Sequence, residues 1–376
     1  MLFFELIQVS IGRRDRLSMT PSPSEWQYLY QLSVQHALVG VCCQGVKRLP
    51  SEQWPPEEQM VDWIWQAQRI KDQNQLITRR SAEACRLLTE EGFNTCLIKG
   101  QGNARLYGEL ADYRQSGDID IWVTPRESTY HQPKKRTIEY VMRKFPDAIL
   151  RFHHIEYRMC EDAEVELHFL PVYLNNPRLN RHLNVWYRGQ HDVQMGHKVE
   201  LGGEMVAVPT KEFNLIFLLL HIYKHLFEEG IGLRQLMDYY FVLVGELGVS
   251  HDQYWARHWE FKKLVKMLKL EALTGSVMYV MKEAFDMPDK YLVYPPSKPE
   301  GASLLSEIMQ SGSFGLYDTR YKKSDSGRGA KAQIHKFWRK TKRNIALSYH
   351  YPHEGLWEPP FRLYHFFWRG LKLWKI

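Results

Sequence analysis

Hydrophobic positions follow helical spacing near the start of the chain and again in its second half. Ser22-Pro23-Ser24-Glu25 has the pattern of a capping box, which predicts a helix from there to about His36. Apolar residues at steps of three and four predict a long helix over 57–91, and Gly92 suits its C-terminal end. Further helices are predicted in the second half, over 213–228, 231–247 and, as one or two segments, 258–285.

Between these helical regions, apolar and polar residues alternate in short segments, as is typical of β-strands. The segments are 93–98, 118–123, 154–160 and 164–169. A glycine-containing turn at 99–102 and a helix over 103–110 separate the first two strands, and a helix over 128–144 follows the second, with Pro133 able to delay its start. A short turn joins the last two strands and predicts a hairpin. The fold class is therefore α+β: a small mixed β-sheet core flanked by N- and C-terminal helical regions.

This pattern divides the chain into five parts. They are an extension or flexible arm (1–20), an N-terminal helical region (21–92), the mixed core (93–209), a helical domain (210–290) and a basic, aromatic-rich C-terminal segment (291–376). The first apolar residues are followed rather than preceded by arginines, the wrong order for a secretory signal. Met19 opens a cleaner beginning, MTPSPSEW, and is an alternative native start.

Composition excludes several classes of protein. Apolar residues make up 44% and charged residues 25% of the 376 residues, which argues against collagen, a coiled coil and wholesale disorder. The five cysteines are odd in number and lack CxxC spacing, which argues against a disulfide framework and a cysteine-rich zinc site. No uncharged run approaches the length of a membrane-spanning helix. We expect a cytoplasmic protein with no transmembrane segment.

The net charge of +7 is unevenly distributed. Residues 320–376 contain 14 Lys and Arg against 3 Asp and Glu, so this segment carries +11 and the rest of the chain −4. Such a segment is most often a solvated surface, although it can also bind nucleic acid or an anionic lipid surface. The aromatic residues of 361–376 favour a cap over the protein's own core, with peripheral membrane contact as the alternative.

Carboxylates recur on one face of the predicted strands. Asp118 and Asp120 follow Gly117 on alternate positions, so both fall on one face of a strand. Glu166 and His168 share a face of a later strand, and Glu166 joins the aspartates if the two strands pair. Oxygen ligands so placed favour a hard cation such as Mg²⁺. For the aspartate pair taken alone, a solvent-exposed polar face of an edge strand is the alternative.

The order of these motifs resembles the nucleotidyltransferase superfamily that includes the DNA polymerase β-like enzymes. It is most similar to a bacterial branch in which a Lys-Gly turn replaces the superfamily's Gly-Ser turn. The matching segments are CLIKGQGNARLYG, YRQSGDIDIWV, VELHF and HIYKHLFEEGIGLRQLMDYY, within about residues 30–245.

The resemblance implies a nucleotidyltransferase that moves a nucleoside monophosphate from an NTP such as ATP to a hydroxyl of a small molecule, a sugar or a protein. Asp118, Asp120 and Glu166 would be catalytic and would bind Mg²⁺ or Mn²⁺, and Glu166 could instead accept a proton. The nucleotide-binding residues would be Lys99, Gly100, Gln101, Gly102, Arg114 and Gly117. Because the serine of the Gly-Ser turn is missing, a nucleotide- or partner-binding protein with weak or no turnover is the alternative.

Several further side chains have more than one interpretation. His168 is expected either to orient substrate or to serve as a structural histidine. His221 and His225 are four residues apart on a predicted helix, and they are expected to line the wall of the site, to bind zinc or to pack against neighbouring residues. Arg114 is expected to neutralise phosphate or to pair with Asp112 or Asp118, and Arg234 is expected to pair with Asp238.

Other catalytic classes lack their motifs. The sequence has no G-x-x-x-x-G-K-[ST] phosphate loop, no complete dinucleotide fingerprint and no G-x-S-x-G elbow. A nucleic-acid acceptor is conceivable because of the basic segment, but a smaller acceptor or a protein hydroxyl is favoured.

Overall fold

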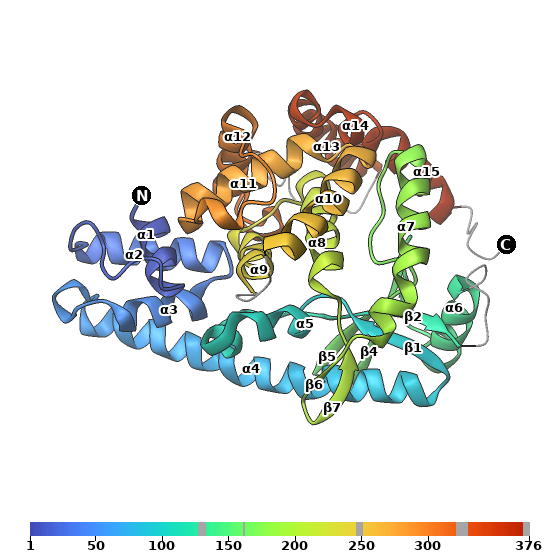
Figure 1. The fold of residues 1–376 in the computed structure, drawn as a ribbon, viewed down its shortest axis with the longest axis horizontal. Helices are drawn as coiled ribbons and strands as arrows, with labels where there is room; N and C mark the ends of the chain where they lie inside the picture. The colour runs from blue at the N-terminus through green and yellow to red at the C-terminus, as the bar shows by residue number, and fades with distance from the viewer. Residues whose placement is uncertain (127–132, 161, 246–250, 321–329, 371–376) are drawn as a thin grey trace.

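The computed structural model describes the chain except for residues 127–132, 161, 246–250, 321–329 and 371–376. Figure 1 shows the long helix α4 (Glu57–Glu90) along one side of the molecule. The N-terminal helices lie against one part of α4 and the β-sheet against another, while the later helices cover the opposite side of the sheet (Figure 1). The structure is thus an α+β fold with helical regions on both sides of a small sheet, as predicted.

The N-terminal region contains the helices α1 (Leu2–Ser10), α2 (Pro23–Gln35), α3 (Val39–Arg48) and α4. The predicted capping box is present, since Ser22 Oγ accepts from the Glu25 amide at 3.3 Å and a Glu25 oxygen accepts from the Ser22 amide at 2.7 Å. The described thiols in this region, those of Cys42, Cys43 and Cys85, are free and buried. The observed bounds of α2 and α4 agree with the predicted ones to within one residue.

The first residues of the chain form a packed helix. Phe3, Leu6 and Ile7 of α1 are fully buried, and α1 packs against α3 and against α11 (Glu271–Phe285). The helices α1 and α3 approach closely at Gly45, where a Cβ atom would lie 2.2 Å from Ser10 Oγ. The flexible-arm interpretation of this segment is therefore wrong for residues 2–10, because a short apolar helix gains its stability by burial against neighbours. A native start at Met19 stays a prediction.

The five-stranded sheet has the order β1–β2–β5–β4–β3. Its strands are β1 (Phe93–Leu97), β2 (Ile119–Pro125), β3 (Ile149–Leu150), β4 (His154–Cys160) and β5 (Ala163–His168). The strands β2 and β5 run parallel, and all other pairs are antiparallel. The sheet is thus mixed, and the predicted hairpin is formed by β4 and β5.

The two faces of the central strand differ in character. Ile119, Ile121 and Val123 point into a core shared with α4 and α6 (Pro133–Lys144). On the other face, Trp122 stacks on Phe213 with ring centroids 5.9 Å apart. Because side chains alternate along a strand, Asp120 lies on the Trp122 face and is directed toward the later helices rather than toward α4.

Two parts of the core differ from the sequence analysis. In place of the helix predicted over 103–110, α5 (Gln101–Ala104) is followed by a 3₁₀ segment, Arg105–Tyr113, which is itself kinked at Gly108, where φ is +57°. After β5 the chain forms a long helix, α7 (Pro177–Gly196), that the sequence analysis did not predict. A small separate hairpin, β6 (Lys198–Leu201) and β7 (Glu204–Ala207), follows it and was also missed.

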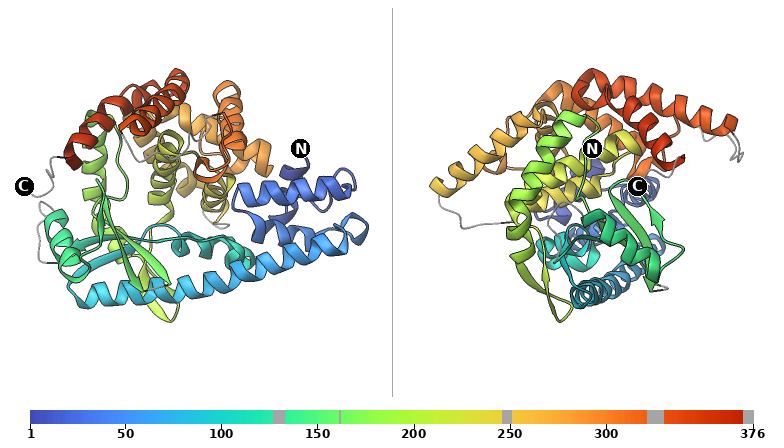
Figure 2. Two further views of the ribbon diagram at one scale, coloured as in Figure 1. Left: turned by 180° about the vertical axis from the view of Figure 1, so that it is seen from behind. Right: turned by 90° about the vertical axis from the view of Figure 1, so that its right-hand side faces the viewer.

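The later helices are α8 (Lys211–Glu228), α9 (Leu233–Val244), α10 (His251–Met267), α11, α12 (Lys298–Ser311), α13 (Ala330–His350), α14 (Pro352–Gly355) and α15 (Glu358–Gly370). Residues 258–285 thus belong to two helices rather than one. Figure 2 shows α15 and part of α13 lying over the other helices, while one end of α13 extends beyond them in the right-hand view. None of the described helices is both long and apolar enough to cross a membrane.

The basic C-terminal segment is built into the fold. Arg343 of α13 is 7% exposed; its Nε donates to Glu307 at 3.0 Å and its Nη2 to the Leu226 carbonyl at 2.7 Å. One side of α15 covers the sheet edge, where the Trp368 ring lies 5.8 Å from that of Phe152. The expected aromatic cap is thus present on that side, whereas the side chains of Leu363, Phe366 and Phe367 are exposed.

Candidate functional site

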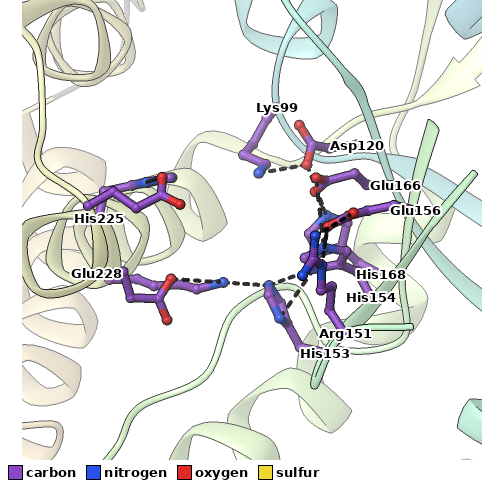
Figure 3. Close-up of polar contacts among 12 residues, drawn as sticks. Lys99, Asp120, Arg151, His153, His154, Glu156, Glu166, His168, His225 and Glu228 are labelled. Atoms are coloured by element: carbon purple, nitrogen blue, oxygen red, sulfur yellow. Dashed lines mark hydrogen bonds and ion pairs between the residues drawn. The ribbon is translucent and has the colours of Figure 1, made fainter. Parts of the chain in front are cut away.

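A cavity of about 990 Å³ separates the sheet from α8, α9 and α13. Figure 3 shows the side chains of β2, β4 and β5 on one side of it and those of α8 on the other. Most of the predicted site residues line this cavity, namely Lys99, Gly100, Arg114, Gly117, Asp118, Asp120, Glu166, His168, His221 and His225. Gln101 and Gly102 do not. The residues singled out in the sequence therefore gather around one cavity.

Strand pairing places a row of carboxylates across the sheet. Asp120 on β2 lies opposite Glu166 on the parallel strand β5. Glu166 lies opposite Glu156 on the antiparallel strand β4, and His168 lies opposite His154. The predicted meeting of Asp120 and Glu166 is confirmed. His154 and Glu156 were missed, although the reversed spacing His-x-Glu and Glu-x-His in the two arms of a hairpin is a signal that could have revealed them.

Asp120 is held by two partners. Lys99 Nζ lies 2.6 Å and His168 Nε2 2.9 Å from its Oδ1 atom. Burial would raise the pKa of Asp120, but Lys99 and His168 hold it well below its usual range. Burial would likewise lower the pKa of Lys99, but Asp120, Glu166 and the nearby Asp118 together raise it. Asp120 and Lys99 are therefore both charged at neutral pH.

Glu166 lies between two histidines. Its Oε2 atom is 3.2 Å from His168 Nε2, and its Oε1 atom is 3.7 Å from His154 Nε2. Burial and the neighbouring Asp120 carboxylate raise the pKa of Glu166 to about 8. Burial lowers the pKa of His168 in spite of its hydrogen bond to Asp120. Without a cation, the cluster thus holds Glu166 largely protonated at neutral pH.

Asp118 lies apart from this compact group. It precedes the first residue of β2 and is exposed, but it lines the same cavity. The ligand atoms of Asp120, Glu166 and His168, in contrast, all lie within 4.8 Å of one another. Of the three predicted acids, two therefore meet directly, and Asp118 faces them from the cavity mouth.

The glycine turn at 99–102 has an unusual backbone conformation. Gly100 has φ +55° and ψ −117°, a conformation that side chains with a Cβ atom disfavour. The Gly102 amide is occupied by the Lys99 carbonyl at 3.0 Å. The Gln101 side chain points away from the cavity and donates to the Asn74 carbonyl at 3.0 Å. The Gly102 amide and the Gln101 side chain are thus engaged within the fold, and Lys99 is the residue of the turn that brings a charge to the cavity. The phosphate-binding role of the turn's backbone amides stays a prediction.

Arg114 has a partner that the sequence analysis did not identify. Its Nε and Nη2 atoms donate to the two oxygens of Asp238 at 2.7 and 2.8 Å, and the Tyr107 hydroxyl donates to the same carboxylate at 2.6 Å. The proposed pairing of Arg114 with Asp112 or Asp118 is wrong, as is that of Arg234 with Asp238. Arg234 Nη1 instead donates to the Gln115 carbonyl at 2.6 Å. Arg114 therefore ties the loop before β2 to α9.

The helix α8 forms the opposite wall. His221 and His225 line the cavity and lie 3.2 Å apart between their Nε2 atoms. No third ligand joins them in any metal-binding group among the described residues, so the wall interpretation is favoured over zinc. Lys224, on the same helix, donates to His153 Nε2 at 2.7 Å across the cavity.

Comparison with known proteins agrees with this geometry. The profile of a family described as uncharacterised nucleotidyltransferase matches residues 22–286. The chain belongs to this family. The match includes α2 to α11, and with them all strands of the sheet and the wall helix α8.

Among solved structures, an antigenic nucleotidyltransferase-like protein from Paracoccidioides brasiliensis is similar. The match has 14% sequence identity and a TM-score of 0.31, and it covers 53% of this chain and 93% of the other. No curated protein matched the sequence.

The residues present fit the divalent cation that a nucleotidyltransferase site implies. Asp120 and Glu166 offer oxygens and His168 a nitrogen from adjacent strands, at separations that one ion can span. All three side chains are shielded from solvent, with exposures of 4%, 17% and 1%. A buried set of acids is costly without a positive partner, and in this structure Lys99 supplies one.

Proposed function

We propose that the protein is a metal-dependent nucleotidyltransferase that transfers a nucleoside monophosphate from an NTP to a hydroxyl of an acceptor. The observation that carries this proposal is the pairing of Asp120 with Glu166 on adjacent parallel strands, at the edge of a cavity with the size of a small-molecule site. In the reaction, the acceptor oxygen forms a bond to the α-phosphorus, the bond to the β-phosphate oxygen breaks, and pyrophosphate leaves.

The protein's own residues would mainly bind and position the substrates. Lys99 and Arg234 line the cavity and carry positive charge for the phosphates. Arg234 suits this role because its buried Nε atom has no hydrogen-bond partner in the described part of the chain. A cation on Asp120, Glu166 and His168, with Asp118 of the same cavity as a further ligand, would supply the positive charge that stabilises the transition state. Positioning and charge stabilisation account for most of the catalysis of phosphoryl transfer in enzymes of this kind.

A nucleotide-binding protein with weak or no turnover is the second candidate. It is favoured by the short distance between Lys99 and Asp120, because an internal ammonium group already neutralises the acid that a cation would use. For transfer to occur, the Lys99 ammonium must move toward the phosphates as the cation arrives.

The two candidates differ in release of pyrophosphate. We would incubate the full chain with each NTP labelled at the α-phosphate, with Mg²⁺ or Mn²⁺, and with sugars, small alcohols and the protein's own hydroxyls as acceptors. We expect label transfer with pyrophosphate release, and loss of at least a hundredfold in rate for Asp120→Asn. Glu164→Gln is the matched control, since Glu164 lies two residues before Glu166 on β5 but is exposed and outside the cavity.

Calorimetry separates a failed enzyme from a binding protein. Nucleotide binding that depends on Lys99 and Arg234, with no pyrophosphate release from any acceptor, would favour the second candidate. Equal transfer rates for Asp120→Asn and wild type would refute the proposed site.

A further inference from the structure

The hairpin of β4 and β5 carries a second set of ligand atoms beside the one already described. His154 and Glu156 alternate on β4, and Glu166 and His168 alternate on β5 in the reverse order. The antiparallel register sets the two histidines opposite each other and the two glutamates opposite each other. Since residues at alternate positions share a face, all four side chains point into the same cavity.

Glu166 presents one oxygen to each of two groups. Its Oε2 atom lies toward His168 and Asp120, whereas its Oε1 atom lies toward His154 and Glu156. The ligand atoms of His154, Glu156 and Glu166 lie within 4.8 Å of one another, as do those of the first group. One carboxylate thus stands between two adjacent three-residue sets (Figure 3).

The separations in the second set suit a small divalent ion. His154 Nε2 is 3.0 Å from Glu156 Oε1 and 3.7 Å from Glu166 Oε1. Ligands about 2.1 Å from one ion lie about 3.0 Å apart in octahedral and about 3.4 Å apart in tetrahedral geometry. Small rotations of these side chains are therefore enough to bring them around one ion.

The surroundings of His154 resemble those of a metal-binding imidazole. Its side chain is 10% exposed, and its Nδ1 atom lies 3.3 Å from His153 Nδ1. The same atom lies 3.2 Å from His153 Nε2, so the His153 ring takes the place of the carboxylate, carbonyl or water that commonly orients a ligating histidine. His153 is in turn held by Lys224 at 2.7 Å. The ring is thus supported from behind while its Nε2 atom faces the two glutamates.

Arg151 is the positively charged partner of Glu156 in this structure. Its Nε atom donates to Glu156 Oε1 at 2.6 Å and its Nη2 atom to Oε2 at 2.9 Å. The Arg151 side chain is 37% exposed, so it can swing into solvent, unlike the buried Lys99. Glu156 is therefore an acid whose present partner can be replaced.

We propose that His154, Glu156 and Glu166 form a second divalent-cation site, bridged through Glu166 to the one at Asp120 and His168. Because it contains an imidazole, as the set at Asp120 and His168 also does, this site binds a transition-metal ion such as Mn²⁺ or Zn²⁺ more tightly than Mg²⁺. The proposal goes beyond nucleotidyl transfer and does not depend on it, since its test measures ion binding in the absence of any nucleotide.

The test counts Mn²⁺ ions on the metal-free full-length protein by electron paramagnetic resonance, in which bound Mn²⁺ loses the sharp signal of the free ion. We expect two Mn²⁺ per chain in the wild type, with a magnetically coupled spectrum. His154→Gln and Glu156→Gln should each bind one ion, with at least a tenfold loss of affinity for the second. The spectrum of the remaining ion should be that of an isolated centre.

Two controls address non-specific effects. His182→Gln changes an exposed histidine of α7 outside the cavity, and Glu164→Gln an exposed acid of β5; both should bind two ions. Circular dichroism checks that each variant is folded, and the use of two separate site variants guards against the failure of one.

The result also separates this proposal from the preceding one. One Mn²⁺ in the wild type, lost in Asp120→Asn but kept in His154→Gln, would overturn the second site and leave the proposed transferase intact. Two ions in both site variants would overturn it as well. Retention of one ion by Asp120→Asn, with loss of transfer activity, supports two distinct sites.

Discussion

Replacing Asp238 by Asn is expected to destabilise the protein strongly. Arg114 and Asp238 are only 4% and 6% exposed, and the pair is bidentate, with a third hydrogen bond from Tyr107. The substitution keeps the shape of the side chain but removes its charge. The buried guanidinium of Arg114 would then have no counter-ion, because Arg234, the other arginine nearby, carries the same sign of charge.

The magnitude follows from burial. Breaking a buried ion pair by neutralising one partner costs about 3–5 kcal/mol, whereas an exposed pair one helical turn apart contributes about 0.3–0.5 kcal/mol. For a chain of 376 residues, the larger cost lowers Tm by roughly 4–6 °C, taking an unfolding entropy of about 2.1 cal/mol/K per residue. Glu90→Gln is the matched control, since Glu90 pairs with Arg86 at 2.7 Å on the surface of α4. The side chains of Glu90 and Arg86 are 56% and 43% exposed.

Differential scanning calorimetry measures both shifts. A further variant with Arg114→Met and Asp238→Leu removes both charges, and we expect it to recover most of the lost stability, because a buried pair and an apolar pair of similar volume are often nearly equal in stability. If Asp238→Asn lowers Tm no more than Glu90→Gln does, the idea that this pair anchors the loop before β2 to α9 is refuted.

Three further predictions concern positions outside the proposed cation sites. Burial lowers the pKa of His36 to about 4, so the stability that its neutral form contributes is fully present above pH 6.5 and is lost as the pH falls toward 4. Urea unfolding should therefore give a free energy of unfolding about 2 kcal/mol lower at pH 5 than at pH 7.5 from this group, and His36→Gln should lack that difference. Gly100→Ala should lower the free energy of unfolding by about 1–3 kcal/mol, because residue 100 has a positive φ. Gly189 lies in α7 with nothing within 4 Å of a new Cβ atom, so Gly189→Ala should raise the free energy of unfolding by about 0.5–1 kcal/mol in the same assay. Phe3→Ala should cost about 3–5 kcal/mol by urea unfolding if α1 belongs to the core; a cost below 1 kcal/mol would restore the flexible-arm interpretation.

Local patterns were enough to predict the central acids. Alternation along a strand fixes which side chains share a face, and the order of strand, turn, helix and strand favoured pairing of the segments that carry Asp120 and Glu166. The capping box at Ser22 likewise depends on residues three positions apart and could be predicted from the sequence alone. The prediction was less exact for Asp118, because a strand's first residue depends on where pairing begins.

Partners distant in the sequence could not be predicted in this way. Arg114 and Asp238 are separated by 124 positions, and no local pattern distinguishes Asp238 from Asp112 or Asp118 as a partner. For His154 and Glu156, alternation was visible, but which face of β4 meets the cavity depends on the register with β5. The kink at Gly108 required a backbone conformation that a count of apolar positions does not reveal.

Several basic residues of the C-terminal segment lie at the cavity rather than on open surface. Lys340 and Arg343 of α13 and His365 of α15 line the same cavity as Asp120, and Arg343 is fixed by Glu307 of α12. The positive charges of Lys340 and Arg343 at the cavity would attract an anionic substrate. Removing residues 320–376 would therefore open the cavity and expose the apolar surface that α13 and α15 cover. A loss of nucleic-acid binding after such a truncation would report damage to the site, so the segment has to be tested by single substitutions at exposed positions such as Lys342.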